Sequence, residues 1–142
     1  MASRLVFVDT SGLVALLNQD DSLHSLARIR WQELGQTARK VVLTDWILAE
    51  TGNGLARTGA RAAFVETARR FLNSADGRLV DVTLEIMEKA LGLYLQRPDK
   101  SWGLVDCASF VLMSKEGIFE AFTTDRHFEQ AGFTCLLPTS AS

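Results

Sequence analysis

The sequence has no apolar run long enough to cross a membrane. Its longest apolar runs, Leu5–Val8 and Leu13–Leu17, are far shorter than the roughly 20 residues that span a bilayer as a helix. Asp9 interrupts the first run before the apolar region of a secretory signal develops. We therefore expect a cytoplasmic protein without a membrane association.

Cysteine and excess positive charge are also scarce. Only Cys107 and Cys135 are present, and no closely spaced group of cysteine and histidine exists, which argues against a zinc site. Two reduced thiols are typical of a cytoplasmic protein. The net charge of −2 argues against a protein that coats nucleic acid, which would be basic. It leaves open an enzyme that holds a nucleic acid through a local basic patch.

The sequence is typical of one globular domain, residues 1–142, with 47% hydrophobic and 23% charged residues. We find no repeat or linker. Five short apolar runs predict buried strands, and segments with helical spacing lie between them. This alternation predicts an α/β layer structure with a mainly parallel sheet. The predicted strands are Leu5–Val8, Val41–Thr44, Arg78–Val82, Ala121–Thr124 and Phe133–Leu137.

Four segments carry apolar stripes at helical spacing, and we assign these stripes to the core. Asp21 or Ser22 is the expected N-cap of the first helix, the third is expected to start after Thr83, and Gly117 is expected to end the last. The stripes are Leu23, Leu26, Ala27, Trp31 and Leu34; Phe64, Ala68, Phe71 and Leu72; Leu84, Met87, Leu91, Tyr94 and Leu95; and Val105, Ala108 and Leu112.

Four acidic residues from distant parts of the chain are predicted to meet at one edge of the sheet. Asp9 and Asp125 follow predicted strands, so they lie at carboxyl ends, where ligands bind in open α/β sheets. Glu50 is on a helix that starts near Asp45, directly after a strand. Asp106 is near the start of a helix that leads into the next strand, and such a helix begins at the same edge.

A group of carboxylates at one edge requires a counter-ion. Two carboxylates about 5 Å apart repel by roughly 3 kcal/mol at an effective dielectric near 20. Oxygen ligands with no histidine or cysteine nearby favour Mg²⁺ or Mn²⁺ over zinc. Such an ion can position and acidify a water for attack on phosphorus. The group therefore predicts phosphodiester hydrolysis.

Each acid also has a purely structural interpretation. Asp9 could cap the helix that begins at Ser11. Glu50 and Asp106 could be acids favoured by the dipole at a helix start, and Asp125 could be a turn residue. Their joint placement favours the metal site.

Four segments, in order and spacing along the whole chain, resemble the motifs of the PIN-domain family, in particular its VapC-type ribonuclease toxins. The resemblance implies a three-layer fold with a mainly parallel five-stranded sheet flanked by helices. It also implies a Mg²⁺-dependent endoribonuclease, a dimer, and inhibition by a cognate antitoxin that inserts a segment near the active site. The segments are Phe7–Gly12, Ile47–Thr51, Ser101–Phe110 and Phe122–Phe128, the last extended by Glu129–Phe133.

Neighbouring hydroxyls are expected to support the acids. Thr10 and Ser11 could bind a phosphate oxygen or a water, or cap the helix that follows. Gly103 departs from the family, because many relatives carry a serine there, before the third aspartate. Ser101 or Thr124 could supply the missing hydroxyl.

Three residues are candidate contacts to RNA or to a protein partner. Arg57 and Arg61 would share a helix face if the helix beginning at Asp45 continued through Gly59, although a solvated face is an equal alternative. Trp102, next to the third motif, could stack on a base. His127 could contact RNA or act as an acid, but a lone histidine in a helical turn is more typical of a structural residue. We therefore place His127 outside the catalytic set.

The preferred hypothesis is an endoribonuclease with Asp9 and Asp106 as principal metal ligands, completed by Glu50 and Asp125. The alternative is a PIN-like protein that binds RNA or a partner and has no cleavage activity of its own. A phosphatase or phosphoacceptor domain is disfavoured, because the sequence lacks a second acid two residues after Asp9.

Overall fold

A computed structural model describes residues 4–74 and 78–139 and shows a five-stranded sheet in which every pair of strands is parallel. The strand order is β3-β2-β1-β4-β5. The strands are β1 (Leu5–Val8), β2 (Lys40–Thr44), β3 (Leu79–Val80), β4 (Glu120–Phe122) and β5 (Thr134–Cys135). The helices are α1 (Thr10–Leu17), α2 (His24–Gln36), α3 (Asp45–Leu55), α4 (Arg61–Leu72), α5 (Leu84–Gln96), α6 (Leu104–Glu116) and α7 (His127–Gln130).

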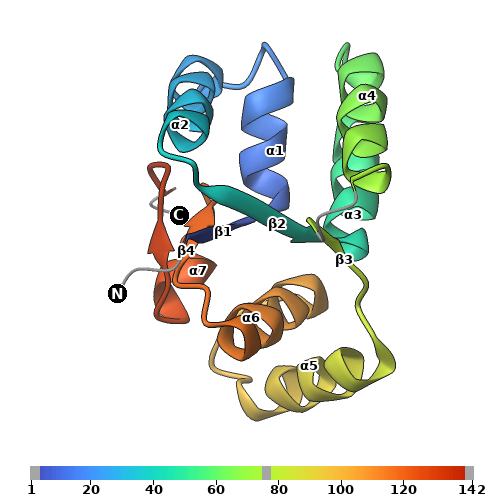
Figure 1. Ribbon diagram of the computed structural model, residues 1–142. Helices are drawn as coiled ribbons and strands as arrows, with labels where there is room; N and C mark the ends of the chain where they lie inside the picture. Colours follow the sequence, from blue (N-terminus) through green and yellow to red (C-terminus); the bar gives the residue numbers. More distant parts are fainter. Residues whose placement is uncertain (1–3, 75–77, 140–142) are drawn as a thin grey trace.

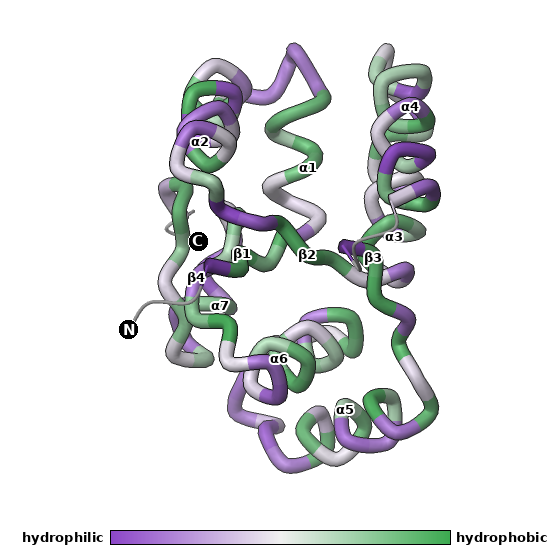
Figure 2. Tube along the Cα trace, viewed as in Figure 1, coloured by the Kyte–Doolittle hydropathy of each residue, from purple (hydrophilic) through white to green (hydrophobic). Residues whose placement is uncertain are grey.

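The helices cover both faces of the sheet, as predicted. Figure 1 shows α1 and α2 on one face and α6 on the other, with α5 stacked outside α6. Helix α4 packs against α3, beside α1. The hydropathy colours of Figure 2 show apolar residues along β2 and in the helices next to it, α1 and α6. None of the helices in the described ranges has the length and apolar content needed to span a bilayer.

The five predicted strands are all present, but three are shorter than predicted. The segment Arg78–Val82 forms only the two residues of β3, and Phe133–Leu137 forms only the two of β5. Strand β4 ends at Phe122 instead of Thr124. Its pairing stops there because the next two residues hydrogen-bond with the start of α1 instead of with a strand.

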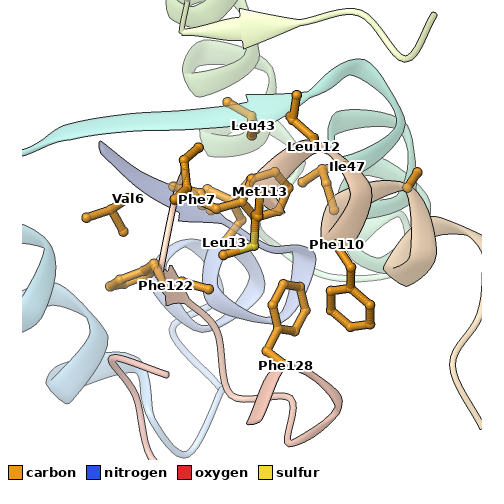
Figure 3. Packing of buried hydrophobic residues seen from close by; sticks show 14 of the residues in the cluster. Val6, Phe7, Leu13, Leu43, Ile47, Phe110, Leu112, Met113, Phe122 and Phe128 are labelled. Atoms are coloured by element: carbon orange, nitrogen blue, oxygen red, sulfur yellow. The ribbon is translucent and has the colours of Figure 1, made fainter. Parts of the chain in front are cut away.

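The core lies between the sheet and the helices and is rich in aromatic rings (Figure 3). The ring of Phe128 lies 6.3 Å from that of Phe7 and 4.9 Å from that of Phe110. Trp31 packs edge-on against Phe122, with 5.3 Å between ring centroids, so this half-buried ring lies against the core at its edge.

The predicted core stripe of α5 is wrong. Leu84, Leu91, Tyr94 and Leu95 are exposed, by 84%, 44%, 54% and 80%. Helix α5 packs mainly on α6 and not on the sheet, so only the side that carries Ile86 and Ala90 is buried. Leu72 at the end of α4 is also exposed and not in the core.

The predictions for the helix ends are partly confirmed. Thr83 caps α5 by accepting a hydrogen bond from the backbone N–H of Ile86. Gly117 ends α6 in the left-handed region, at φ +66°. Helix α2 begins later than predicted, and Asp21 accepts the N–H of Leu23 in the turn before it.

Gly12 allows α1 to approach the end of β4 closely. A Cβ at this position would lie 2.1 Å from the carbonyl oxygen of Phe122 and 2.6 Å from Cδ1 of its ring. Both groups are buried, so a side chain could be admitted only if α1 moved away from the sheet. That contact sets the position of the residues just before Gly12, among them Asp9 and Ser11.

We predict that Gly12→Ala lowers the free energy of unfolding by about 1–3 kcal/mol, as overpacking in a core does. Urea unfolding measures the effect. Gly35→Ala, in α2, is the control, because an added Cβ there meets no atom within 4 Å and alanine favours the helix. Equal stability of the two variants would contradict the close packing at Gly12.

Candidate metal centre

The acidic residues lie where the two central strands end. Strands β1 and β4 are paired, with Val8 opposite Phe122. Asp9 follows β1 directly, and its backbone N–H donates to the carbonyl of Phe122. Asp125 is three residues beyond β4, and Asp106 lies in the first turn of α6. These positions belong to the carboxyl edge of the parallel sheet.

Asp9 is 4% exposed and its carboxylate is held by hydroxyl groups. Its Oδ2 accepts hydrogen bonds from the hydroxyls of Ser11 at 2.9 Å and Thr123 at 2.8 Å. The same oxygen accepts the backbone N–H of Ser11 and so caps α1. The capping interpretation is therefore correct, but it does not exclude a site, because Oδ1 makes no hydrogen bond within the described part of the chain.

Thr123 is the residue of this group that the sequence analysis missed. Its side chain is fully buried, and its Oγ1 also accepts the backbone N–H of Asp125. Thr124, which was predicted, contributes its backbone N–H to Ser11 Oγ at 2.9 Å. A signal was present, since Thr123 continues a run of buried residues and a buried hydroxyl requires a partner.

A second group consists of Asp106, Asp125 and His127, all partly exposed. His127 Nδ1 lies 3.0 Å from Asp106 Oδ2 and 3.4 Å from Asp125 Oδ1. The three residues offer ligand atoms that all lie within 4.8 Å of one another. His127, which was placed outside the catalytic set, therefore lies beside two of the acids, and the premise that no histidine lies near them is wrong. The signal was its position two residues after Asp125, across a single turn.

The residues before α6 tie this second group together. Gly103 has no side chain to offer, but its backbone N–H donates to Asp106 Oδ2 at 3.2 Å. Ser101 Oγ lies 3.1 Å from His127 Nε2. Ser101 therefore contacts the group through the imidazole.

Glu50 stands apart from the other three acids. It is exposed on α3, and its Oε1 accepts a hydrogen bond of 2.5 Å from the hydroxyl of Thr10. Thr10 is next to Asp9, so this bond connects α3 to the start of α1. Glu50 thus reaches the centre from the side, through the residue beside Asp9.

Burial and mutual repulsion perturb the central carboxyl groups. The pKa of Asp9 is raised from 3.8 to about 6, mainly by burial. The hydroxyls of Thr123 and Ser11 lower it, and the charges of Asp106 and Asp125 raise it further. The pKa of Asp106 is also raised, first by burial, while its hydrogen bond with His127 opposes the increase. A bound cation would relieve both effects.

The predicted RNA contacts have different surroundings from those expected. Helix α3 ends at Leu55 and α4 starts at Arg61, so Arg57 and Arg61 do not share a face of one continuous helix. The guanidinium of Arg61 donates to the carbonyl of Ala56. Trp102 is only 7% exposed and its indole N–H donates to Gln130, so little of its ring is accessible to a base.

A hollow of about 520 Å³ adjoins the centre beside Ser101 and Gly103. Lys100 and Arg97 also line it. Arg97 donates two hydrogen bonds of 3.0 Å to Asp99 and lies over the Trp102 ring. The loop before α6 therefore carries cationic side chains next to the acidic residues.

The chain is similar in sequence to known proteins. A family model described as PIN domain matches residues 6–134. The chain is 33% identical over 135 residues to the 23S rRNA-specific endonuclease VapC20 of Mycobacterium tuberculosis, a match that covers 94% of this chain and 99% of that protein.

Solved structures show the same fold. The crystal structure of M. tuberculosis VapC20, described as a sarcin-ricin loop cleaving toxin, superposes with a TM-score of 0.83 at 32% identity, covering 94% of this chain and 99% of that one. VapBC2 from Rickettsia felis, bound to a DNA fragment from its promoter, superposes with a TM-score of 0.62 at 14% identity, covering 92% of this chain and 96% of that one. FitAcB from Neisseria gonorrhoeae superposes with a TM-score of 0.65 at 16% identity, covering 94% of this chain and 97% of that one. At these low identities, the last two show the fold alone.

We predict that the metal-free protein becomes less stable as the pH rises from about 4 to about 6. The pKa of Asp9 is higher in the folded than in the unfolded chain, so folding is favoured while Asp9 is protonated and loses this advantage as the pH passes the folded pKa. Asp9→Asn should remove this decline and stabilise the metal-free protein at pH 7 by up to about 3 kcal/mol.

Urea unfolding in EDTA between pH 4 and 8 measures this pH dependence. Asp20→Asn, an exposed aspartate in the loop after α1, is the control and should keep the wild-type curve. A decline that persists unchanged in Asp9→Asn would show that Asp9 is not its source.

Proposed function

The chain belongs to the PIN-domain family, and from this we infer that it is a metal-dependent endoribonuclease, a VapC-like toxin that hydrolyses RNA phosphodiester bonds. One structural observation supports the assignment of this activity to the acidic residues. Asp106, Asp125 and His127 offer ligand atoms within 4.8 Å of one another. Thr123 connects this group to buried Asp9, because its hydroxyl donates to Asp9 Oδ2 and accepts the backbone N–H of Asp125. We propose that residues 1–142 form a single PIN domain.

We propose Mg²⁺ or Mn²⁺ as the metal. The available donors near Asp9 are carboxylate oxygens, which these hard ions bind. Asp9 and Asp106 are the principal ligands in this proposal, and Glu50 and Asp125 complete the centre directly or through water. When bound, such an ion supplies an acidified water for attack on phosphorus and neutralises charge on the phosphate.

The remaining residues of the site orient these ligands. Ser11 and Thr123 hold one oxygen of Asp9, Oδ2, so that Oδ1 would be available to bind a metal ion. Gly103 fixes Asp106 through its N–H, and Thr10 holds Glu50. The N–H of Thr124 fixes the hydroxyl of Ser11. Ligands held in this way lose little conformational freedom when the ion binds.

RNA is the proposed substrate, and its phosphates require cations near the centre. Arg57 and Arg61 remain proposed contacts on the α3–α4 side. Lys100, in the loop that leads to Asp106, is a further contact that the structure suggests, because it lines the hollow beside Ser101. Trp102 would act here mainly by holding Arg97 against its ring.

The proposed partner is a cognate antitoxin protein, and the proposed location is the cytoplasm. The similar crystal structure of 32% identity is described as that of a toxin, and toxins of this type need an inhibitor in the cell that makes them. An antitoxin segment placed near the carboxylates would block the access of both RNA and metal.

We further propose that the chain forms a homodimer through α5. Its exposed apolar residues, Leu84, Leu91 and Tyr94, share with Met87 a spacing of three, four and three residues. This is the a/d pattern by which two helices pack along a common seam. In a two-fold dimer the same surface of both copies forms the interface. The apolar seam of α5 in a second copy would therefore match this one. Leu95 extends the same face.

We predict that the purified, antitoxin-free chain cleaves RNA only with Mg²⁺ or Mn²⁺, and that Asp9→Asn and Asp106→Asn each lower the rate at least about 100-fold. Gel analysis of a defined RNA measures the rate. Asp99→Asn is the control, since Asp99 is an exposed acid paired with Arg97. RNA binding without any metal-dependent cleavage by the wild-type chain would favour the alternative of a PIN-like binding protein.

We predict that Leu91→Glu converts the dimer into a monomer in sedimentation equilibrium, because it places two charges in the apolar seam. Leu72→Glu is the control, as Leu72 is another exposed leucine, at the end of α4 and outside the proposed interface. A dimer that survives Leu91→Glu and Tyr94→Glu would exclude the α5 interface.

A further inference from the structure

The imidazole of His127 lies between the two more exposed aspartates of the centre. We propose that His127 Nδ1 is itself a metal ligand, so that the ion is held by a mixed nitrogen and oxygen set that includes Asp106 and Asp125. This inference rests on the proposed function, because it concerns the same metal. It changes the predicted chemistry of the site, which the sequence had suggested to be oxygen alone.

The distances in the structure fit such a set. Adjacent ligands on an octahedral ion with bonds of about 2.0–2.1 Å lie about 3 Å apart. His127 Nδ1 lies 3.0 Å from Asp106 Oδ2 and 3.4 Å from Asp125 Oδ1. Nδ1 is therefore spaced from each carboxylate oxygen as neighbouring ligands of one small ion are, and the ligand atoms of the three residues all lie within 4.8 Å of one another.

The other ring nitrogen has the partner that a metal-bound histidine requires. A ligating histidine usually donates its second N–H to a protein oxygen, which fixes the tautomer and the ring plane. His127 Nε2 lies 3.1 Å from Ser101 Oγ. If Nε2–H donates to this hydroxyl, Nδ1 presents its lone pair toward the two carboxylates, and an ion between them removes the repulsion.

The backbone around His127 keeps the ring in this place. The N–H of His127 donates to Asp125 Oδ1 at 2.9 Å, which orients both side chains together. The next residue, Phe128, is fully buried between Phe7 and Phe110 (Figure 3). The imidazole is thus mounted on a turn that is fixed to the core, as a precise ligand requires.

A nitrogen ligand alters the choice of metal. Mg²⁺ binds oxygen almost exclusively, whereas transition-metal ions accept imidazole. The mixed set therefore favours Mn²⁺ over Mg²⁺, and the preference should depend on His127. Without a metal, a proton on Nδ1 can instead occupy the position between the ring and Asp106.

Electron spin-echo spectroscopy of the Mn²⁺-loaded protein tests the ligand directly. We expect modulation from a bound ¹⁴N in the wild type, and its replacement by a ¹⁵N signal when only histidine is ¹⁵N-labelled. The chain has two histidines, and His24 contacts a backbone carbonyl in the α1–α2 region. His24→Gln should therefore keep the modulation and His127→Ala should lose it.

Metal titrations of the same variants test the consequence. In His127→Ala the Kd for Mn²⁺ should rise about 10-fold or more and the Kd for Mg²⁺ less than about 3-fold, since only the nitrogen bond is lost. Ser101→Ala should weaken Mn²⁺ binding less and keep the ¹⁴N modulation. Asp106→Asn should weaken both ions.

The two proposals fail in different ways. A wild-type protein that binds Mn²⁺ through Asp106 without ¹⁴N modulation would refute the role of His127 and leave the nuclease assignment intact. Equal or tighter Mn²⁺ binding in His127→Ala would do the same, and would mean that the ring occupies the place of the ion. A wild-type protein that binds neither ion would overturn both.

Discussion

The geometry of the centre depends on the hydrogen bonds that join the start of α1 to the end of β4. Asp9, Ser11 and Thr123 form this junction, and Gly12 allows it by keeping the helix against Phe122. The junction ends the pairing of β4, caps α1 and leaves one oxygen of Asp9 available. A single set of contacts therefore determines both the local fold and the position of the most buried ligand.

The same arrangement is unfavourable for the empty protein. A buried carboxyl group with a pKa near 6, close to two other acids, stores free energy that a cation would release. The hydroxyls of Ser11 and Thr123 offset only part of this cost. The core behind the site, with aromatic rings packed around Phe128, supplies the rigidity that keeps the acids together.

The order of elements, the parallel sheet and the positions of Asp9, Asp106 and Asp125 at strand and helix ends could be predicted from the sequence, whereas Glu50 lies in the middle of α3 and apart from them. These features follow from local apolar runs and from the direction of the chain. The buried side of α5 could not be predicted, because the helix carries apolar residues on two sides. One side has Leu84 and Leu91 and the other has Ile86 and Ala90, and only packing on α6 determines that the second is buried. The contacts of His127 and Thr123 were missed for a related reason. Both depend on how two distant segments dock, and the spacing of residues along one segment carries no information on docking.

Consecutive residues at the start of α7 serve different parts of the molecule. His127 faces the carboxylates, and Phe128 enters the aromatic core. A change in the size of Phe7 or Phe110 would tilt this short turn and displace the imidazole. Substitutions of these core residues among relatives should consequently be accompanied by compensating substitutions near the imidazole. Engineering of the metal preference could therefore start from core positions that do not contact the ion.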